Sequence, residues 1–286
     1  MNIMKFRPLF YIISLTLLSV SIFSIIKWRF VPSIDFAGGT VWEFKAPNLK
    51  NVDPINNIFD TQKIQLSSIS PEGDGKYLLK FANINQDQKV SLDNSIKTID
   101  KDFQELRFET LGPTLGKELL QKTIFAIILS SLALLLFIGS RFKDLTFGAS
   151  AVLAMLHDSI ILIGAFSLLG HFLGAEVDSL FVTALLTTLS ASVHDTVVTF
   201  DRIRELKRQN TKIDWVEMAN QAVSEVIVRS INNSMTVIFM LLALVVLGGD
   251  TTRWFALALL IGVVCGTYSS TAVAIPLVLF WKRNKK

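Results

Sequence analysis

Six long apolar runs constrain the fold of this chain more than any other feature of its sequence. A helix needs about 20 apolar residues to cross a bilayer, and each run is close to that length with few charged side chains. In lipid the backbone must satisfy its own hydrogen bonds, so such runs form α-helices. The sequence therefore predicts an α-helical polytopic membrane protein with six transmembrane helices. The runs are residues 8–26, 123–139, 145–169, 180–200, 230–247 and 254–281.

Composition agrees with a membrane protein and argues against several other classes. Hydrophobic residues make up 51% of the chain, and the mean hydropathy of +0.48 is high for a soluble protein. The only cysteine, Cys265, rules out an intrachain disulfide, and three scattered histidines do not form a structural zinc motif. No cytoplasmic segment is long enough for an ATPase domain. We therefore expect no metal and no cofactor, and any energy for work must come from an ion gradient or a partner.

The segment between the first two runs has the character of a soluble α+β domain. Strand-like alternation occurs at 40–45, 64–69, 77–81 and 105–110, and helical spacing occurs at 52–61 and 86–103. A turn sequence at 71–75 separates the second and third strands. The resulting order β-α-β-β-α-β is the ferredoxin-like pattern.

Lysine and arginine residues orient the six helices. Cytoplasmic segments are enriched in these residues, and the enriched segments here are those on the side of both termini, whereas the short loops on the other side contain only Arg253. Both termini are therefore predicted to be cytoplasmic. The basic residues are Lys5, Arg7, Arg141, Lys143, Arg202, Arg204, Lys207, Arg208, Lys212, Lys282, Arg283, Lys285 and Lys286.

These patterns divide the chain into four parts. We predict a first transmembrane helix at 8–27, a periplasmic α+β domain at 31–120, a five-helix bundle at 121–281 with a cytoplasmic loop at 201–229, and a basic cytoplasmic tail at 282–286. Within the loop, apolar residues at helical spacing from Trp215 to Val226 indicate either an amphipathic helix along the membrane or a solvated segment.

Asp195 lies inside the fourth apolar run. An ionisable side chain at the centre of a membrane helix costs about 2.5–3.5 kcal/mol, so it is rarely present without a function. Asp195 belongs to a polar seam on one helix face, which must meet protein or water because lipid offers no hydrogen bonds. A structural acid, paired once and then inert, is the alternative. The seam consists of Thr188, Ser192, Asp195, Thr199 and Arg202.

Arg229 opens the fifth run and is the natural ionic partner for Asp195. Asn232 and Asn233 follow it and extend a polar face into the membrane. The alternative is an anchor whose long side chain reaches the lipid headgroups. In the third run, His157 and Asp158 form a second ionisable pair; adjacent helical residues point about 100° apart, so one can join the seam while the other fixes packing.

Small residues indicate two further features. Gly262, Gly266 and Ser270 recur every four residues in the last run, a spacing that lets helices approach closely, inside this chain or between chains. Near the soluble domain, glycine and proline residues predict hinges to the membrane helices. The group around Gly112 and Gly116 does not have the spacing of a phosphate-binding loop. The hinge residues are Gly38, Gly39, Gly112, Pro113 and Gly116.

Several of these motifs resemble those of the SecD/SecF family, within the resistance-nodulation-division superfamily. They are Ser33-Ile-Asp-Phe-Ala-Gly-Gly-Thr40, Leu111-Gly-Pro-Thr-Leu-Gly-Lys-Glu-Leu119, His157-Asp158, the run from Asp195 to Glu205, and Gly266-Thr-Tyr-Ser-Ser270. The resemblance implies action with SecD beside the SecYEG channel, using the proton-motive force to help pull unfolded polypeptides outward through the membrane. It implies no nucleic-acid partner.

The resemblance also implies that Asp195 and Arg229 carry the proton-coupled step. Candidate supporting residues are His194, Asp158, His157, Thr199, Asn232 and Asn233. The family usually has asparagine where this chain has His194, which places an extra titratable group beside the key acid.

Three other functions compete with this interpretation. An intramembrane hydrolase is disfavoured, and no enzymatic activity is expected, because Ser192 and His194 lie on nearly opposite sides of one helix. A non-transporting assembly scaffold and a stand-alone small-solute exporter remain alternatives. A carboxylate among hydroxyls suits either H⁺ or Na⁺, so the coupling ion is left open.

Overall fold

The computed structural model describes residues 2–49, 51–142, 144–209 and 213–283. It divides into two compact units. One unit, Pro32–Phe125, contains the β-sheet, and the other combines Met1–Val31 with Ala126–Lys286 and contains the helical bundle. Lys143, Lys212, Lys285 and Lys286, which the sequence assigned to cytoplasmic segments, lie outside the described residues.

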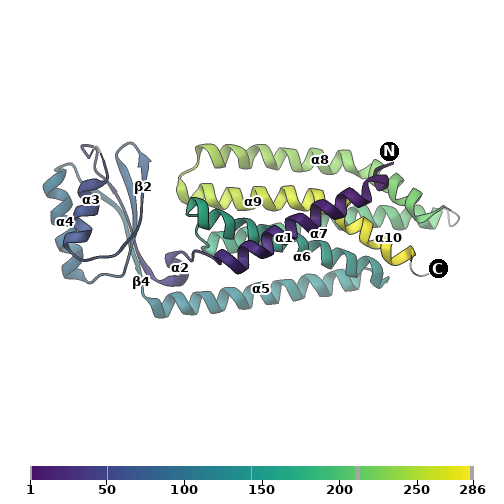
Figure 1. The fold of residues 1–286 in the computed structure, drawn as a ribbon, viewed down its shortest axis with the longest axis horizontal. Helices are drawn as coiled ribbons and strands as arrows, with labels where there is room; N and C mark the ends of the chain where they lie inside the picture. Colours follow the sequence, from purple (N-terminus) through teal and green to yellow (C-terminus); the bar gives the residue numbers. More distant parts are fainter. Residues whose placement is uncertain (1, 50, 143, 210–212, 284–286) are drawn as a thin grey trace. The chain divides into compact units, whose positions relative to one another are not determined.

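Within the described residues, six helical segments are long and apolar enough to cross a bilayer, which confirms the number predicted. The last segment is interrupted by a π-helix, and a short 3₁₀ turn precedes the first. Figure 1 shows these elements. They are η1 (Ile3–Phe6), α1 (Arg7–Trp28), α5 (Pro113–Arg141), α6 (Leu145–Leu173), α7 (Ser179–Gln209), α8 (Trp215–Leu247), α9 (Asp250–Ser269), the π-helix η2 (Ser270–Ala274) and α10 (Ile275–Arg283).

Local signals set the start and end of α6. Asp144 caps its first turn by accepting hydrogen bonds from the Thr146 backbone nitrogen at 3.0 Å and the Thr146 hydroxyl at 2.7 Å. The same carboxylate forms an ion pair with Lys282 of α10. Burial by itself raises the pKa of Asp144, but the bonds from Lys282 and Thr146 outweigh it and lower the pKa from 3.8 to about 2. Gly174 ends the helix in the left-handed conformation, at φ 72°.

The predicted loop at 201–229 is instead the ends of two long helices. α7 continues to Gln209 and α8 begins at Trp215. Met218 and Ala222 are buried in the bundle core, so this stripe packs on protein and does not lie along the membrane surface. Arg202 pairs with Glu225 across the two helices, which explains how a charged segment stays helical on its outer face while its inner face is apolar.

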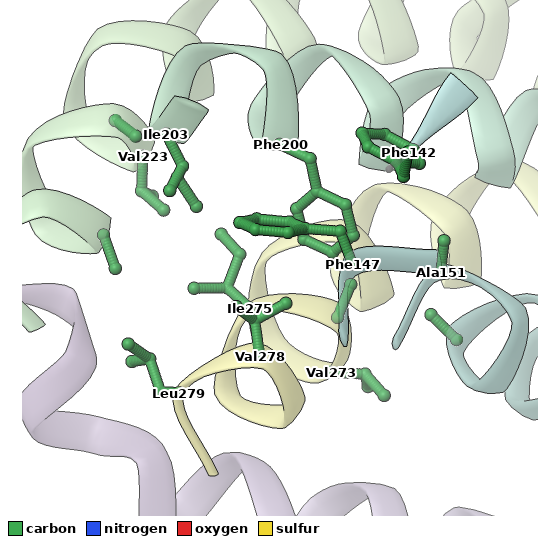
Figure 2. Close-up of a cluster of buried hydrophobic side chains, with 14 of the residues drawn as sticks. Phe142, Phe147, Ala151, Phe200, Ile203, Val223, Val273, Ile275, Val278 and Leu279 are labelled. Atoms are coloured by element: carbon green, nitrogen blue, oxygen red, sulfur yellow. The ribbon is translucent and has the colours of Figure 1, made fainter. Parts of the chain in front are cut away.

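The bundle is held together by a core between α6, α7, α8 and α10. Phe147 of α6 and Phe200 of α7 meet edge to face, with ring centroids 5.0 Å apart. Figure 2 shows Ile203, Val223 and Ile275 beside this pair. In contrast, α1, α5 and α8 keep many of their apolar side chains exposed within this chain. Such exposed apolar faces suit contact with lipid or with another membrane protein.

The Pro32–Phe125 unit follows the predicted order of helices and strands. Its four strands form one sheet in the order β2-β3-β1-β4, and β1 is antiparallel to both neighbours. Trp42 and Phe44 of β1 are fully buried beneath the two longer helices together with Phe59 and Phe81. The elements are α2 (Ile34–Ala37), β1 (Gly39–Lys45), α3 (Asp53–Thr61), β2 (Leu66–Gly73), β3 (Lys76–Phe81), α4 (Gln86–Ile99) and β4 (Gln104–Leu111).

The residues predicted as hinges form a tight junction between α2 and the start of α5. Gly38 has φ +77°, and a Cβ there would lie 2.9 Å from the Pro113 Cα. A Cβ on Gly116 would lie 2.9 Å from the Phe36 carbonyl oxygen. Gly112, in contrast, has open space around it. The close approach explains the need for glycine at 38 and 116, and movement at this junction stays a prediction.

Candidate functional site

Among the bundle carboxylates whose side chains the structure describes, Asp158 of α6 is the most enclosed. Its Oδ2 accepts hydrogen bonds from the Ser192 hydroxyl of α7 at 2.6 Å and the Ser269 hydroxyl of α9 at 2.5 Å. Its Oδ1 lies 2.9 Å from Nδ1 of His157. Asp158 is 6% exposed and both serines are buried. The carboxylate therefore joins three helices through serine hydroxyls, and among the described residues its one titratable hydrogen-bond partner is the adjacent histidine.

Asp195 of α7 has a more open environment. It is half-buried, and its Oδ2 accepts a hydrogen bond from the Ser230 hydroxyl of α8 at 2.8 Å. Within the described part of the chain, Asp195 and Arg229 form no ion pair, and the Arg229 side chain is exposed. The expected pairing is thus absent from this arrangement. The reason is helical geometry: Ser230 and Arg229 are adjacent and point about 100° apart, so only one of them meets α7.

A cavity of about 690 Å³ lies beside Asp195, between α7, α8 and α9. Its wall is rich in hydroxyl and amide groups as well as apolar side chains. Asp195, His194 and Asn233 line it, as does Ser192, whose hydroxyl donates to Asp158. We call this space the Asp195 cavity. It places the more open carboxylate in a space large enough for several water molecules.

A second cavity of about 390 Å³, mostly apolar, lies toward the end of the bundle where η1 leads into α1. Ile3, Phe10 and Tyr268 are among the residues that line it, and we call it the Tyr268 cavity. Ser234 and Thr267 line both cavities, and their hydroxyls are 2.6 Å apart. This hydrogen bond between α8 and α9 therefore stands at the boundary of the two spaces.

The glycine ridge of α9 packs against α7 of the same chain. A Cβ on Gly262 would overlap the Thr188 side chain, and a Cβ on Gly266 would lie 3.3 Å from the Ser192 Cα. Ser270, the third residue of the ridge, is buried at the start of η2. The close contact brings the polar seam of α7 against α9. The sequence left open whether the ridge packs inside this chain or on another chain, and in the structure it packs on α7.

The other predicted site residues fall into two groups. Thr199 is buried, but its hydroxyl bonds to the Asp195 backbone carbonyl at 3.1 Å and not to the carboxylate. Arg202, at the end of the seam, pairs with Glu205 and Glu225. Asn232 is exposed and does not line the Asp195 cavity. The structure thus brings together Asp195, His194, Asn233 and, through Ser192, the His157–Asp158 pair, while Arg229, Thr199 and Asn232 stay outside the group.

Three functional candidates were missed by sequence reasoning. Ser230 is the partner of Asp195, Ser269 is a partner of Asp158, and Tyr268 bonds with the Ser14 hydroxyl of α1 at 3.0 Å. Tyr268 and Ser269 lie within the motif 266–270, and Ser230 follows Arg229 directly. The position beside Arg229 could have pointed to Ser230, whereas no sequence signal connects Ser269 or Tyr268 to its partner.

Comparisons with known proteins agree with this geometry. The family described as "Protein export membrane protein SecD/SecF, C-terminal" matches residues 91–284. The chain belongs to the SecD/SecF family. Six spanning helices and this membership make it a multi-pass protein of the bacterial inner membrane.

Full-length relatives support the assignment. The chain is 35% identical over 300 residues to the "Protein translocase subunit SecF" of Thermobaculum terrenum, which covers 99% of this chain and 94% of that protein. It is 34% identical over 296 residues to the protein of the same name from Anaerolinea thermophila, with coverage of 100% and 95%.

The fold is also similar to a larger SecD/SecF-family protein. The crystal structure of SecDF, described as a translocon-associated membrane protein, from Thermus thermophilus matches with a TM-score of 0.87 and 30% identity. The match covers 99% of this chain but 39% of that SecDF chain. This chain therefore corresponds to less than half of the SecDF protein.

Proposed function

We propose that this protein is a subunit of the Sec protein-export machinery that couples ion movement through its helical bundle to a late stage of polypeptide translocation. The observation that carries the proposal is Asp195, a half-buried carboxylate at a cavity between three membrane helices with one neutral hydroxyl as its hydrogen-bond partner. A carboxylate held so loosely can take up a proton or release it without dismantling the helices around it.

SecD is the proposed partner within the membrane. SecDF relatives join the region similar to this chain to further sequence in one polypeptide, and this chain corresponds to 39% of the SecDF chain of known structure. The apolar faces of α1, α5 and α8 that stay exposed here are suited to receive that second part and the surrounding lipid. The SecYEG channel and unfolded exported polypeptides are proposed as further partners on the strength of the family.

The proposed topology places both termini in the cytoplasm and the sheet domain on the periplasmic side. The distribution of lysine and arginine supports this orientation. The strand order β2-β3-β1-β4, together with the β-α-β-β-α-β sequence, supports a ferredoxin-like class for the domain. A domain in that position is available to an emerging polypeptide.

The coupling step follows from the geometry of α7 and α8. A proton from the Asp195 cavity neutralises Asp195 and weakens its attraction for the Ser230 hydroxyl. When Asp195 is charged again, a rotation of α8 by about 100° replaces Ser230 with Arg229 as its partner. Movement of one charge through the membrane potential yields about 2.3 kcal/mol per 100 mV, which is enough to bias two arrangements that differ by a few kcal/mol.

A non-enzymatic role is part of the proposal. Ser192 donates its hydroxyl hydrogen to Asp158, and His194 is an exposed residue of the cavity wall, so neither arrangement supplies a nucleophile with a base. The glycine ridge already packs on α7 of the same chain, which weighs against a scaffold that holds partners through that ridge.

The test is gradient-dependent completion of protein export in membrane vesicles, compared between the wild type and Asp195→Asn. We expect the variant to insert and assemble normally but to lose the effect of the gradient. Asp201→Asn is a matched control on the same helix, since Asp201 pairs with Arg141 at its end. Retention of the gradient effect in Asp195→Asn contradicts the proposal. Repeating the assay with separate H⁺ and Na⁺ gradients identifies the ion.

A further inference from the structure

His157 carries a buried nitrogen that the coupling step above does not use. The side chain is 5% exposed, and its Nε2 has no hydrogen-bond partner among the described residues. Burial of an imidazole nitrogen without a partner is costly, so its presence in an otherwise well-satisfied network needs a reason.

The hydrogen bonds around Asp158 define the state of this imidazole. Asp158 accepts from Ser192 and Ser269 and is 2.9 Å from His157 Nδ1. When Asp158 is ionised its carboxylate can only accept, and in that state Nδ1 carries the hydrogen and donates it to Asp158. The neutral ring then has its lone pair on Nε2, which is the nitrogen without a partner. The pair is thus arranged as a base at His157 oriented by a carboxylate.

His157 lies close to the Tyr268 cavity. Its ring centroid is 6.4 Å from that of Tyr268, which lines this cavity. The Tyr268 hydroxyl also bonds with Ser14 at 3.0 Å and donates to the Phe10 carbonyl oxygen at 3.1 Å, so polar groups of α1 continue from the same point. Tyr268 therefore contacts the surroundings of His157 on one side and the cavity and α1 on the other.

The pair is also linked to the Asp195 cavity. Ser192 lines that cavity and donates its hydrogen bond to Asp158. Ser192 and Asp195 are three residues apart on α7 and therefore share one face. A change of charge at the His157–Asp158 pair is felt at Asp195 through this hydroxyl and through the low dielectric of the bundle.

We propose that His157 is a second proton-binding residue of the bundle, reached from the Tyr268 cavity, with Asp158 as its positioning residue. The proposal rests on the proposed function and adds a site on the other side of the Ser234–Thr267 boundary. In the binding step, a hydronium ion gives one proton to Nε2; the imidazole becomes imidazolium and the hydronium becomes water. The pair then changes from a net charge of −1 to 0 while every hydrogen bond to Asp158 is kept.

Asp195 at one cavity and His157 beside Tyr268, which lines the other, give the bundle a way to alternate. A proton at His157 removes the net negative charge near Asp195, and its departure restores that charge. The helices packed around the pair carry other titratable groups in their central parts, namely Tyr11 of α1, His194 and Asp195 of α7, and Cys265 and Tyr268 of α9.

Nitrogen NMR of the full chain labelled with ¹⁵N-histidine tests the proposal directly. The chain has three histidines, and His171 and His194 are both exposed and serve as internal references. We expect His157 to carry its hydrogen on Nδ1 at high pH and to become doubly protonated on acidification, and Asp158→Asn to shift that midpoint to lower pH. If His157 stays neutral throughout the range in which the two exposed histidines titrate, the proposal is wrong.

Function is tested with His157→Asn in the gradient-dependent export assay, with the SecD partner present. The asparagine amide can still donate to Asp158, but it offers no group equivalent to Nε2. We expect loss of most of the gradient effect, with insertion and assembly unchanged. The control is His171→Asn, which removes an exposed histidine stacked on Trp28 and is expected to retain the effect. Should His157→Asn fail to fold, the NMR titration of the wild type still decides the question.

The outcomes separate this proposal from the proposed function. If Asp195→Asn loses the gradient effect and a folded His157→Asn keeps it, coupling is retained and the second site is rejected. If Asp195→Asn keeps the gradient effect, the coupling role of Asp195 is rejected whatever the histidine shows. If His157 titrates and both variants lose the effect, both proposals stand.

Discussion

The two carboxylates of the bundle have opposite surroundings. Asp158 lies at a closed contact of three helices and receives hydrogen bonds from two serines and a histidine. Asp195 lies at a cavity and receives one bond, from Ser230. Both are on apolar helices, so the type of residue and its hydrophobic context do not distinguish them. The difference teaches that the number of donors and the space around a carboxylate decide whether it fixes a structure or is free to change partner.

The largest expected effect is on stability at the closed contact. Asp158→Ala leaves two hydroxyls and one imidazole without an acceptor, at a cost on the order of 1–3 kcal/mol for each buried group. Asp195→Ala frees one hydroxyl beside a cavity and should cost far less. Unfolding of the purified protein in detergent by a titrated denaturant measures both. Equal losses of stability in the two variants would remove the distinction between the carboxylates.

The contact of α7 with α9 offers the next test. Gly262→Ala places a methyl group against Thr188 and must push the helices apart, which costs about 1–3 kcal/mol. Gly139→Ala is the matched control, since no atom outside its own helix lies within 4 Å of the added carbon. We expect a lower melting temperature for the first variant and an unchanged or higher one for the second. An unchanged melting temperature for Gly262→Ala would show that the stability of the bundle does not depend on the contact between Gly262 and Thr188.

The same substitution, serine to alanine, can be made at a hydrogen-bond donor of each carboxylate. Ser192→Ala removes one of the donors to Asp158 and is expected to lower stability by about 1 kcal/mol. Ser230→Ala removes the donor to Asp195 and is expected to leave stability nearly unchanged while altering the pH dependence of export. Denaturation and export assays on the same preparations provide both measurements. The reverse pattern would assign the switching role to Asp158.

The smallest effect concerns a third carboxylate, outside the spanning helices. The pKa of Asp144 is lowered from 3.8 to about 2 in the folded protein, although its burial acts the other way, so its ion pair with Lys282 contributes stability above pH 4. That contribution is lost as the pH falls from about 4 to about 2. Asp144 is partly exposed, so we expect about 1 kcal/mol or less. The free energy of unfolding, measured at about pH 4 and about pH 2, should fall in the wild type and fall less in Asp144→Asn.

Much of the fold could be predicted because it depends on periodicity. Six apolar runs gave six helices, and alternating residues such as those of β1 gave the strands of the sheet. In the segment 201–229, the helical spacing from Trp215 to Val226 was recognised, but its many charges were taken to place it along the membrane or in solvent and not against the bundle. In the structure those charges occupy the outer faces of α7 and α8, and Met218 and Ala222 occupy the inner one.

The site could be predicted only in part. Spacing along α7 placed Thr188, Ser192 and Asp195 on one face, and the structure puts that face against α9 and the cavity. Spacing does not give the rotation of the neighbouring helix, so Arg229 was chosen as partner where Ser230 is found. For the same reason, the sequence could not show that Asp158 faces two serines from different helices.

The π-helix η2 changes the phase of the last membrane-spanning segment. A π turn contains more residues than an α turn, so every residue beyond it is rotated relative to an unbroken helix. About five α-helical turns separate Gly262 from Phe280, which would place both on one face. Gly262 meets Thr188 of α7, yet Phe280 is 55% exposed. The interruption thus lets one continuous segment serve two sets of neighbours, with α9 packed on α7 beside the Asp195 cavity and α10 packed in the hydrophobic core.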